Sequence, residues 1–340
     1  MLKKTGFEIE IPRIDDLHVH LRQEEFMREM MPFIYQGGVG RVLVMPNLKP
    51  PVTTTQNALD YREELIKEEP RIDYLMTLYL HKGLSVAEIK KAKQNGINNI
   101  KLYPMGVTTN SSEGVSKIEK FYPIFEFMQA ENMILNIHGE TASNYSQNTC
   151  IMNAENKFLP FLKQIHTNFP KLRVVLEHIT TASSREFIEN SSEYLVATIT
   201  AHHLDLVVDD WGGKNHNFCK PVAKYPSDRR ALREAATSGN PKFFLGSDSA
   251  PHKKGTKETA CGCAGVFTAP NLAEYYIDLF DRLGAVEKFE NFATKFGADF
   301  YQLPKNQGKI VLKKQEKQIP DQIAGVVPFK AGKKIGWTVI

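Results

Sequence analysis

IDDLHVH, at residues 14–20, decides the fold, because it is a short strand-like run that ends in two histidines. Seven further short, β-rich and largely apolar runs follow along the chain. They are RVLVMP (41–46), DYLMTLY (73–79), NNIKLY (98–103), MILNIH (133–138), RVVLEH (173–178), LVATIT (195–200) and KFFLGS (242–247). Runs of this length and character are typical of strands that are buried on both faces of a sheet.

Helical patterns fill most of the gaps between these runs. Residues 56–69 carry apolar side chains at helical spacing, residues 85–94 open with an N-cap serine, and residues 227–237 begin with serine and aspartate. Strands that alternate with helices form parallel sheets with right-handed crossovers. Eight such units predict an α/β fold, a closed (β/α)8 TIM barrel, and no GxGxxG motif supports a Rossmann sheet. The chain of 340 residues is predicted to be one domain, 1–340, with 303–340 as a short C-terminal extension.

The composition is that of a folded globular protein, with 42% hydrophobic and 24% charged residues. The net charge is +4, but eight lysines against Glu316 and Asp321 give residues 303–340 a charge of +6. The first 302 residues therefore sum to −2. This distribution predicts a solvated lysine-rich tail, and it does not favour a nucleic-acid partner.

The four cysteines form no CxxC pair, and the first 15 residues contain no apolar segment typical of a signal peptide. No stretch approaches the 18 apolar residues that a membrane span requires. We therefore expect a reduced, cytoplasmic protein without a membrane partner.

Polar residues gather where the predicted strands end. His18 and His20 close the first run, His138 the fifth and His178 the sixth, and Asp248 follows the eighth. In TIM barrels the C-terminal ends of the strands meet at one mouth, where catalytic groups lie. Histidines two apart on a strand face the same side, and imidazoles with a carboxylate suit zinc. The sequence therefore predicts a metal site at that mouth.

Lys101, near the end of the fourth run, does not fit this ligand set directly. An ammonium group has three donors and no lone pair, so it cannot bind a cation. Two explanations stay open on the residues alone. Carbon dioxide could convert the amine to a carbamate that bridges two metal ions, or an unmodified lysine could face an anionic substrate.

Seven motifs, in their order and spacing, resemble the type II dihydroorotase family of the amidohydrolase superfamily. They are DDLHVHLR (15–22), VMPNLKPPVTT (44–54), KLYP with TTNSSEGV (101–115), HGE (138–140), EHITT (177–181), GSDSAPH (246–252) and ETACGCAG (258–265). The similarity runs from about residue 13 to residue 303 and continues weakly to the end. It implies reversible, zinc-dependent hydrolysis of (S)-dihydroorotate to N-carbamoyl-L-aspartate, a step of pyrimidine synthesis, by a homodimer.

The resemblance also implies two Zn²⁺ ions per subunit, bridged by carboxylated Lys101 and a hydroxide, with Asp248 as the catalytic acid and base. The implied metal ligands are His18, His20, Lys101, His138, His178 and Asp248. The implied substrate-binding residues are His20, Arg22, Asn47, Thr108, Thr109, His138, Lys220, His252 and Ala264. Among these, Arg22, Asn47 and His252 would hold the substrate carboxylate. The main chain at Lys220 and Ala264 would contact the ring, and the two threonines would belong to a mobile loop.

Residues 201–225 depart from the family pattern, and Lys220 stands where an apolar residue is expected. His202, His203 and His216 lie in this segment and are predicted to be surface or loop histidines outside the site. The Cys261-Gly262-Cys263 sequence is interpreted as a packed loop near the substrate.

Two alternative functions stay open. Another cyclic amidohydrolase, such as a hydantoinase or allantoinase, would share the metal ligands but not the carboxylate-binding residues. A catalytically inactive scaffold of the same family would typically have lost ligands, and all six are present here.

Overall fold

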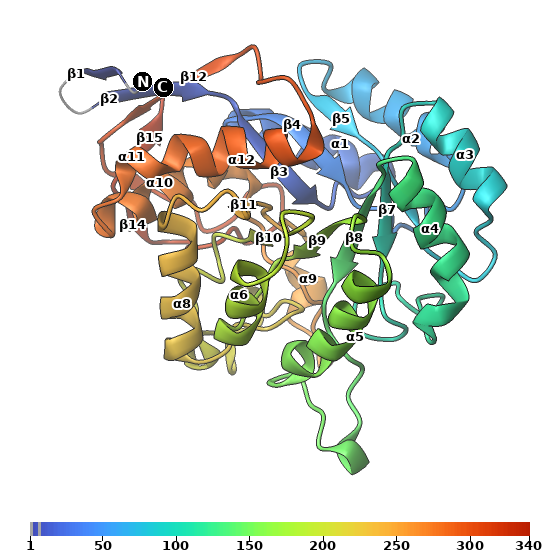
Figure 1. Cartoon of the computed structure of the whole chain (residues 1–340). Coiled ribbons are helices and arrows are strands. Elements are labelled where there is room, and N and C mark those ends of the chain that lie inside the picture. Colours follow the sequence, from blue (N-terminus) through green and yellow to red (C-terminus); the bar gives the residue numbers. More distant parts are fainter. Residues whose placement is uncertain (1–2, 6–7) are drawn as a thin grey trace.

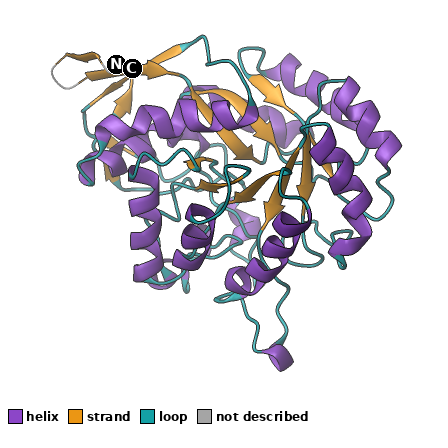
Figure 2. Ribbon diagram, viewed as in Figure 1, coloured by secondary structure: helices purple, strands orange, loops and turns teal. Residues whose placement is uncertain are grey.

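The computed structural model, which describes residues 3–5 and 8–340, is a barrel of parallel strands surrounded by helices (Figures 1 and 2). Three strands form one hydrogen-bonded part of the wall, in the order β3-β4-β5, and six form the other, in the order β11-β10-β9-β8-β7-β6. Their bounds are β3 (Ile14–Val19), β4 (Val39–Val44), β5 (Asp73–Leu75), β6 (Thr77–Tyr79), β7 (Asn99–Leu102), β8 (Ile134–His138), β9 (Arg173–Glu177), β10 (Leu195–Ile199) and β11 (Phe243–Leu245). The predicted α/β barrel is confirmed.

The two parts of the wall meet at two seams. At the first, the predicted strand 73–79 is interrupted at Met76, so β5 pairs with β4 while β6 pairs with β7. At the second, the main chain after β11 continues the ladder to β3. The amide of Asp248 donates to the carbonyl of His18 at 2.9 Å, and the amide of His20 donates to the carbonyl of Ser249 at 3.1 Å.

Helices cover the outside of the wall. The longer ones are α1 (Glu24–Gln36), α2 (Thr55–Glu68), α3 (Val86–Gln94), α4 (Tyr122–Ala130), α5 (Ala154–Asn168), α6 (Ala182–Glu189), α8 (Pro226–Thr237) and α10 (Leu272–Arg282). Shorter ones are α7 (Val208–Trp211), α9 (Lys254–Lys257), α11 (Val286–Glu290) and α12 (Phe296–Tyr301). Ser85 caps α3 as predicted, since its side chain accepts from the amide of Glu88. Within the described residues, no helix is long and apolar enough to cross a membrane.

One end of the barrel interior is filled with apolar side chains. Leu17, Leu43, Ile134, Val175, Val196 and Phe244 form a cluster there with residues of α12. The hydroxyl of Tyr301, on α12, donates to the side-chain oxygen of Asn136 at 2.6 Å. This packing closes one end of the interior, and the predicted histidines and Asp248 lie at the opposite mouth.

The C-terminal segment is folded against the barrel, so the predicted solvated tail is wrong. Strand β12 (Lys309–Lys313) pairs with β2 (Glu8–Pro12) and β15 (Thr338–Val339), and β2 also pairs with β1 (Lys3–Thr5); the two termini consequently lie side by side (Figure 1). A second small hairpin joins β13 (Lys317–Gln318) to β14 (Lys334–Ile335). Apolar residues interleaved with the lysines explain the folding. Ile310, Leu312, Ile319, Phe329, Ile335 and Trp337 are buried, while Lys314, Lys317 and Lys330 form ion pairs with Asp281, Glu274 and Asp205.

Candidate active site

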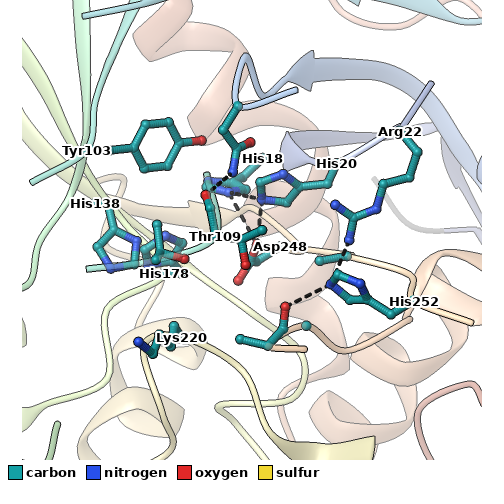
Figure 3. A pocket seen from close by; sticks show the side chains of 15 residues that line it. His18, His20, Arg22, Tyr103, Thr109, His138, His178, Lys220, Asp248 and His252 are labelled. Atoms are coloured by element: carbon teal, nitrogen blue, oxygen red, sulfur yellow. Dashed lines mark hydrogen bonds and ion pairs between the residues drawn. The ribbon is translucent and has the colours of Figure 1, made fainter. Parts of the chain in front are cut away.

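A pocket opens at the mouth formed by the C-terminal ends of the strands (Figure 3). Twelve of the thirteen residues predicted for the site line it: His18, His20, Arg22, Asn47, Thr108, Thr109, His138, His178, Lys220, Asp248, His252 and Ala264. The thirteenth, Lys101, is fully buried beneath the lining. Tyr103, Ala250 and Gly265 complete the wall and were missed by the sequence reasoning, although Tyr103 ends a predicted strand.

His18, His20 and Asp248 form one tight group. Oδ1 of Asp248 lies 3.1 Å from Nε2 of His20 and 3.4 Å from Nε2 of His18, and the two Nε2 atoms lie 3.4 Å apart. These three ligand atoms are close enough to one another to hold a metal ion, and they form one of the groups in the described chain that could do so. The predicted convergence of β3 and the residue after β11 is therefore present.

His138 and His178 lie beside this group in the pocket (Figure 3). Their ring centroids lie 4.8 Å apart, and the ring of His178 lies 4.9 Å from that of His18. Nε2 of His138 is 2.8 Å from Oε2 of Glu140, which leaves Nδ1 of His138 for another ligand. A carboxylate behind a histidine commonly orients that histidine toward a metal. Glu140 follows His138 in the HGE motif, and this signal was not used in the sequence reasoning.

The electrostatics of the site favour metal binding. Burial lowers the pKa of His18, His138 and His178, so their rings are neutral and keep a lone pair. Burial alone would raise the pKa of Asp248, but hydrogen bonds from His18 and His20 outweigh it and hold that pKa well below its usual range. The carboxylate is therefore ionised among neutral imidazoles, as a cation site requires.

Lys101 is in ion-pair contact with Glu177, another buried carboxylate that the sequence reasoning missed. Burial lowers the pKa of Lys101 well below its ordinary value, which favours the neutral amine that carbamate formation needs. Oε1 of Glu177 lies 3.0 Å from Nδ1 of His18. The ring nitrogen Nδ1 of His178 is buried without a hydrogen-bond partner. His18, Glu177 and His178 offer ligand atoms within 4.8 Å of one another, and with the unpartnered Nδ1 of His178 they fit a bound cation better than a dry core.

Three residues of the site have left-handed backbone conformations. The φ angles are +67° at Arg22, +44° at His178 and +47° at Asp248. Such angles are costly for residues other than glycine and tend to cluster where function fixes a side chain. At Arg22 the hydroxyl of Tyr61 donates to the main-chain carbonyl at 2.5 Å, which helps to hold this conformation.

Arg22 and His252 lie together at the edge of the pocket. Nη2 of Arg22 is 3.1 Å from Nε2 of His252, and Nε of Arg22 donates to the carbonyl of Pro251 at 2.9 Å. Nε2 of His252 also lies 3.0 Å from the carbonyl of Ala264, so it can accept from Arg22 or donate to Ala264 but not both. Burial lowers the pKa of Arg22 to about 10, so the guanidinium is charged at neutral pH.

The main chain on either side of the pocket is held close. Gly265, next to Ala264, has φ +153°, and a Cβ atom there would lie 2.4 Å from the carbonyl of Ala250. Its amide donates to the carbonyl of Phe218 at 2.9 Å, which joins the loop that contains Ala264 to the segment that contains Lys220. Of the nearby cysteines, Cys261 is exposed and Cys263 half-buried, so the predicted packed loop is packed only in part.

His202 and His203 lie in the loop after β10, as one of the predicted alternatives, but both are buried and not at the surface. Nε2 of His203 donates to the carbonyl of Pro221 at 2.9 Å, and Nδ1 accepts from the hydroxyl of Thr200 at 2.8 Å. His216 is partly exposed and pairs with Glu258, as expected of a loop histidine.

Comparisons with known proteins agree with this geometry. The model of the amidohydrolase family matches residues 11–315. The chain is 43% identical to a dihydroorotase of Mycosarcoma maydis and 41% identical to one of Saccharomyces cerevisiae, with 98% of each chain covered. It is also 44% identical to a dihydroorotase of Vibrio atlanticus, with 98% of this chain and 99% of the relative covered.

Solved structures give the same result. The crystal structure of Saccharomyces cerevisiae dihydroorotase in complex with 5-fluoroorotic acid superimposes with a TM-score of 0.95, at 41% identity over 98% of this chain and 99% of that one. An L-hydantoinase from Arthrobacter aurescens superimposes with a TM-score of 0.84 at 16% identity, over 97% of this chain and 83% of that one. At that identity the second likeness concerns the fold alone.

Proposed function

Since this chain belongs to the amidohydrolase family and is a cyclic amide hydrolase of its dihydroorotase group, we propose that its pocket opens and closes the ring of (S)-dihydroorotate. Hydrolysis of the ring amide yields N-carbamoyl-L-aspartate, and the reverse condensation releases water. The condensation is a step of pyrimidine synthesis. The single observation that carries the substrate assignment is the half-buried guanidinium of Arg22 beside His252, in the same pocket as the histidine group.

A carboxylate on the substrate explains why a charged guanidinium is kept in this pocket. Arginine presents a planar fork of donors that matches a carboxylate, and such paired contacts are stronger than those between neutral groups. Asn47 lies on the same rim after β4. Dihydroorotate carries this carboxylate, whereas hydantoin and dihydrouracil do not. Arg22, Asn47 and His252 are therefore proposed to select the substrate.

The described residues fit two zinc ions. His18, His20 and Asp248 would hold one, His138 and His178 the other, and Lys101, as a carbamate, would bridge them. When bound, the ions would lower the pKa of an attacking water and polarise the ring carbonyl. The lowered pKa of Lys101, which burial causes, supports the carbamate.

Asp248 is proposed to move the proton. Its carboxylate lies at the floor of the pocket and is ionised, so it can accept a proton from the attacking water. The same oxygen would then deliver the proton to the ring nitrogen that leaves. Oδ1 of Asp248 lies against Nε2 of His18 and Nε2 of His20, the two rings that would share a zinc ion with it. The main chain at Lys220 and Ala264 would hold the edge of the ring.

Substrate competition tests this proposal. Purified zinc-loaded protein is assayed for ring opening of dihydroorotate, dihydrouracil and hydantoin under the same conditions. We expect dihydroorotate to be preferred by at least about a hundredfold in kcat/KM. The reason is that only dihydroorotate has a carboxylate that can pair with the guanidinium of Arg22. Equal rates on all three would indicate a general cyclic amidohydrolase, and no turnover of any would indicate an inactive scaffold.

We further propose that the protein is cytoplasmic and that residues 1–340 form one domain.

We also propose that the protein is a homodimer. Two observations support association of two copies. Met105 and Phe161 are exposed near one another along one groove, and the segment at Tyr145, itself 87% exposed, projects from the body (Figure 1). Sedimentation at micromolar concentration tests this point, since a monomer would contradict it.

A further inference from the structure

We infer that Lys220 is a positioning residue whose side chain fastens the pocket loop 103–115 at Val107, apart from the contacts that Asn47 makes with Thr109 and Asn110. This inference rests on the proposed function for its kinetic consequence, but not for its structural content. It concerns the one substrate-site position where the sequence departs from the family pattern. The resemblance assigned a role to the main chain of this residue and none to its ammonium group.

The contact that carries the inference joins two separate walls of the pocket. Nζ of Lys220 donates to the carbonyl of Val107 at 3.0 Å. Lys220 lies in the segment between β10 and α8, whereas Val107 lies in the loop after β7 that brings Thr108 and Thr109 over the pocket. Figure 3 shows Lys220 and Thr109 among the side chains that line the cavity.

The loop itself is compact. The hydroxyl of Ser111 donates to the carbonyl of Thr108 at 2.6 Å and accepts from the amide of Thr108 at 3.0 Å. The amide of Gly106 donates to the carbonyl of Ser111 at 3.0 Å. Because these bonds are internal, the segment can move as one piece, and its position depends on contacts with its surroundings.

Those external side-chain contacts fall into two groups. The first group lies at Thr109 and Asn110. The side chain of Asn47 donates to the carbonyl of Thr109 at 3.1 Å, and the main-chain carbonyl of Asn47 accepts from the side chain of Asn110 at 2.8 Å. The hydroxyl of Tyr79 donates to the carbonyl of Asn110 at 3.3 Å. The second group lies at Val107, where Lys220 is the only side chain among the described residues that donates to the main chain of the loop. It is also the only charged one, so its bond is the stronger kind.

The base of Lys220 is itself rigid. The neighbouring carbonyl of Phe218 accepts from the amide of Gly265 and from Nζ of the buried Lys257, both at 2.9 Å. The carbonyl of Pro221 accepts from His203. Because the base is held and the loop is compact, the bond from Lys220 helps to set the position of both threonines, together with the bonds at Thr109 and Asn110. An apolar side chain at this position would leave the Val107 side of the loop without that bond.

Hydrogen exchange of the zinc-loaded full chain, without substrate, tests the inference directly. In Lys220→Met we expect the amides of residues 105–115 to exchange about tenfold faster than in the parent, as loss of one charge-assisted bond implies. Lys220→Arg, which keeps a charged donor, should restore most of the protection. Lys214→Met is the matched control, because Nζ of Lys214 also donates to a carbonyl in this segment, that of Asp209 at 3.3 Å, but away from the pocket.

Kinetics provide the second readout. Lys220→Met is expected to raise KM for dihydroorotate about tenfold and to leave kcat within a fewfold, because the reacting groups are unchanged. Unchanged exchange in Lys220→Met would overturn the inference, even if KM rose, because Lys220 would then act on the substrate alone. If the parent protein failed to turn over dihydroorotate, the proposed function would fail while the exchange result would still decide the role of Lys220.

Discussion

The amide of Asp248 donates to the carbonyl of His18 at 2.9 Å, and the carboxylate of the same aspartate lies 3.4 Å from the ring of the same histidine. One bond belongs to the seam that closes the barrel, and the other contact belongs to the pocket. Closure of the barrel therefore brings His18, at the end of β3, next to Asp248, which follows β11. The site is a direct consequence of the eight-stranded topology.

Removal of the Asp248 carboxylate should abolish turnover without unfolding the protein. Asp248→Ala removes both a metal-binding oxygen and the proposed proton carrier, so we expect kcat to fall by at least about a thousandfold. Circular dichroism should show a native spectrum. Asp60→Ala, an exposed carboxylate on α2, is the matched control and should remain active. Activity within tenfold of the parent in Asp248→Ala would contradict the role assigned to this residue.

Loss of the Arg22 guanidinium should weaken binding of the carboxylate. In Arg22→Met we expect KM for dihydroorotate to rise about tenfold to a hundredfold, as removal of a charged hydrogen-bonding group implies, with a smaller effect on any residual hydrolysis of dihydrouracil. Steady-state kinetics on both substrates measure the difference. Arg28→Met is the control, since Arg28 is exposed and pairs with Glu68 on the outside of the barrel. An unchanged KM would argue against the carboxylate-binding group.

The zinc content should depend on Lys101. We expect the parent chain to hold about two zinc ions, and Lys101→Met to hold fewer after extensive dialysis, because the bridging ligand is lost. Plasma mass spectrometry measures the stoichiometry, and removal of zinc from the parent by a chelator should also lower its melting temperature. Full zinc content in the variant would show that Lys101 is not a ligand.

The buried ring of His203 should make the stability of the protein depend on pH. Burial lowers the pKa of His203 to about 4, from an ordinary value of 6.5. As pH falls from 6.5 toward 4, the unfolded chain takes up a proton at this ring and the folded chain does not, so the free energy of unfolding falls. His203→Asn lacks this proton uptake. The stability gap between parent and variant, measured in urea, should therefore narrow by about 3 kcal/mol between pH 7 and pH 4. A gap that is constant with pH would show that the ring titrates normally in the folded protein.

The sequence alone predicted the barrel and the convergence of the strand-end histidines with Asp248, because both follow from local patterns. A histidine at the end of a buried strand must lie at the barrel mouth, so His138 and His178 could be placed without coordinates. Glu140 lies two residues after His138, and Glu177 lies directly before His178. Their contacts with His138 and Lys101 could therefore have been anticipated from these positions.

Other features depend on contacts between distant segments that no local pattern encodes. The bond between Lys220 and Val107 joins residues 113 positions apart. The burial of His202 and His203 depends on how the segment after β10 turns. The lysines of the C-terminal segment suggested a solvated tail, whereas the alternating Ile310 and Leu312 pair with the N-terminal strand β2.

Anomalous scattering from crystals grown with zinc, collected on both sides of the zinc absorption edge, tests the central claim most directly. The account predicts two peaks in the pocket, one bounded by His18, His20 and Asp248 and one by His138 and His178, with continuous density for a carbamate from Lys101 between them. No peak in this pocket, or zinc found instead at the buried group of His202, His203 and Cys219, would contradict it.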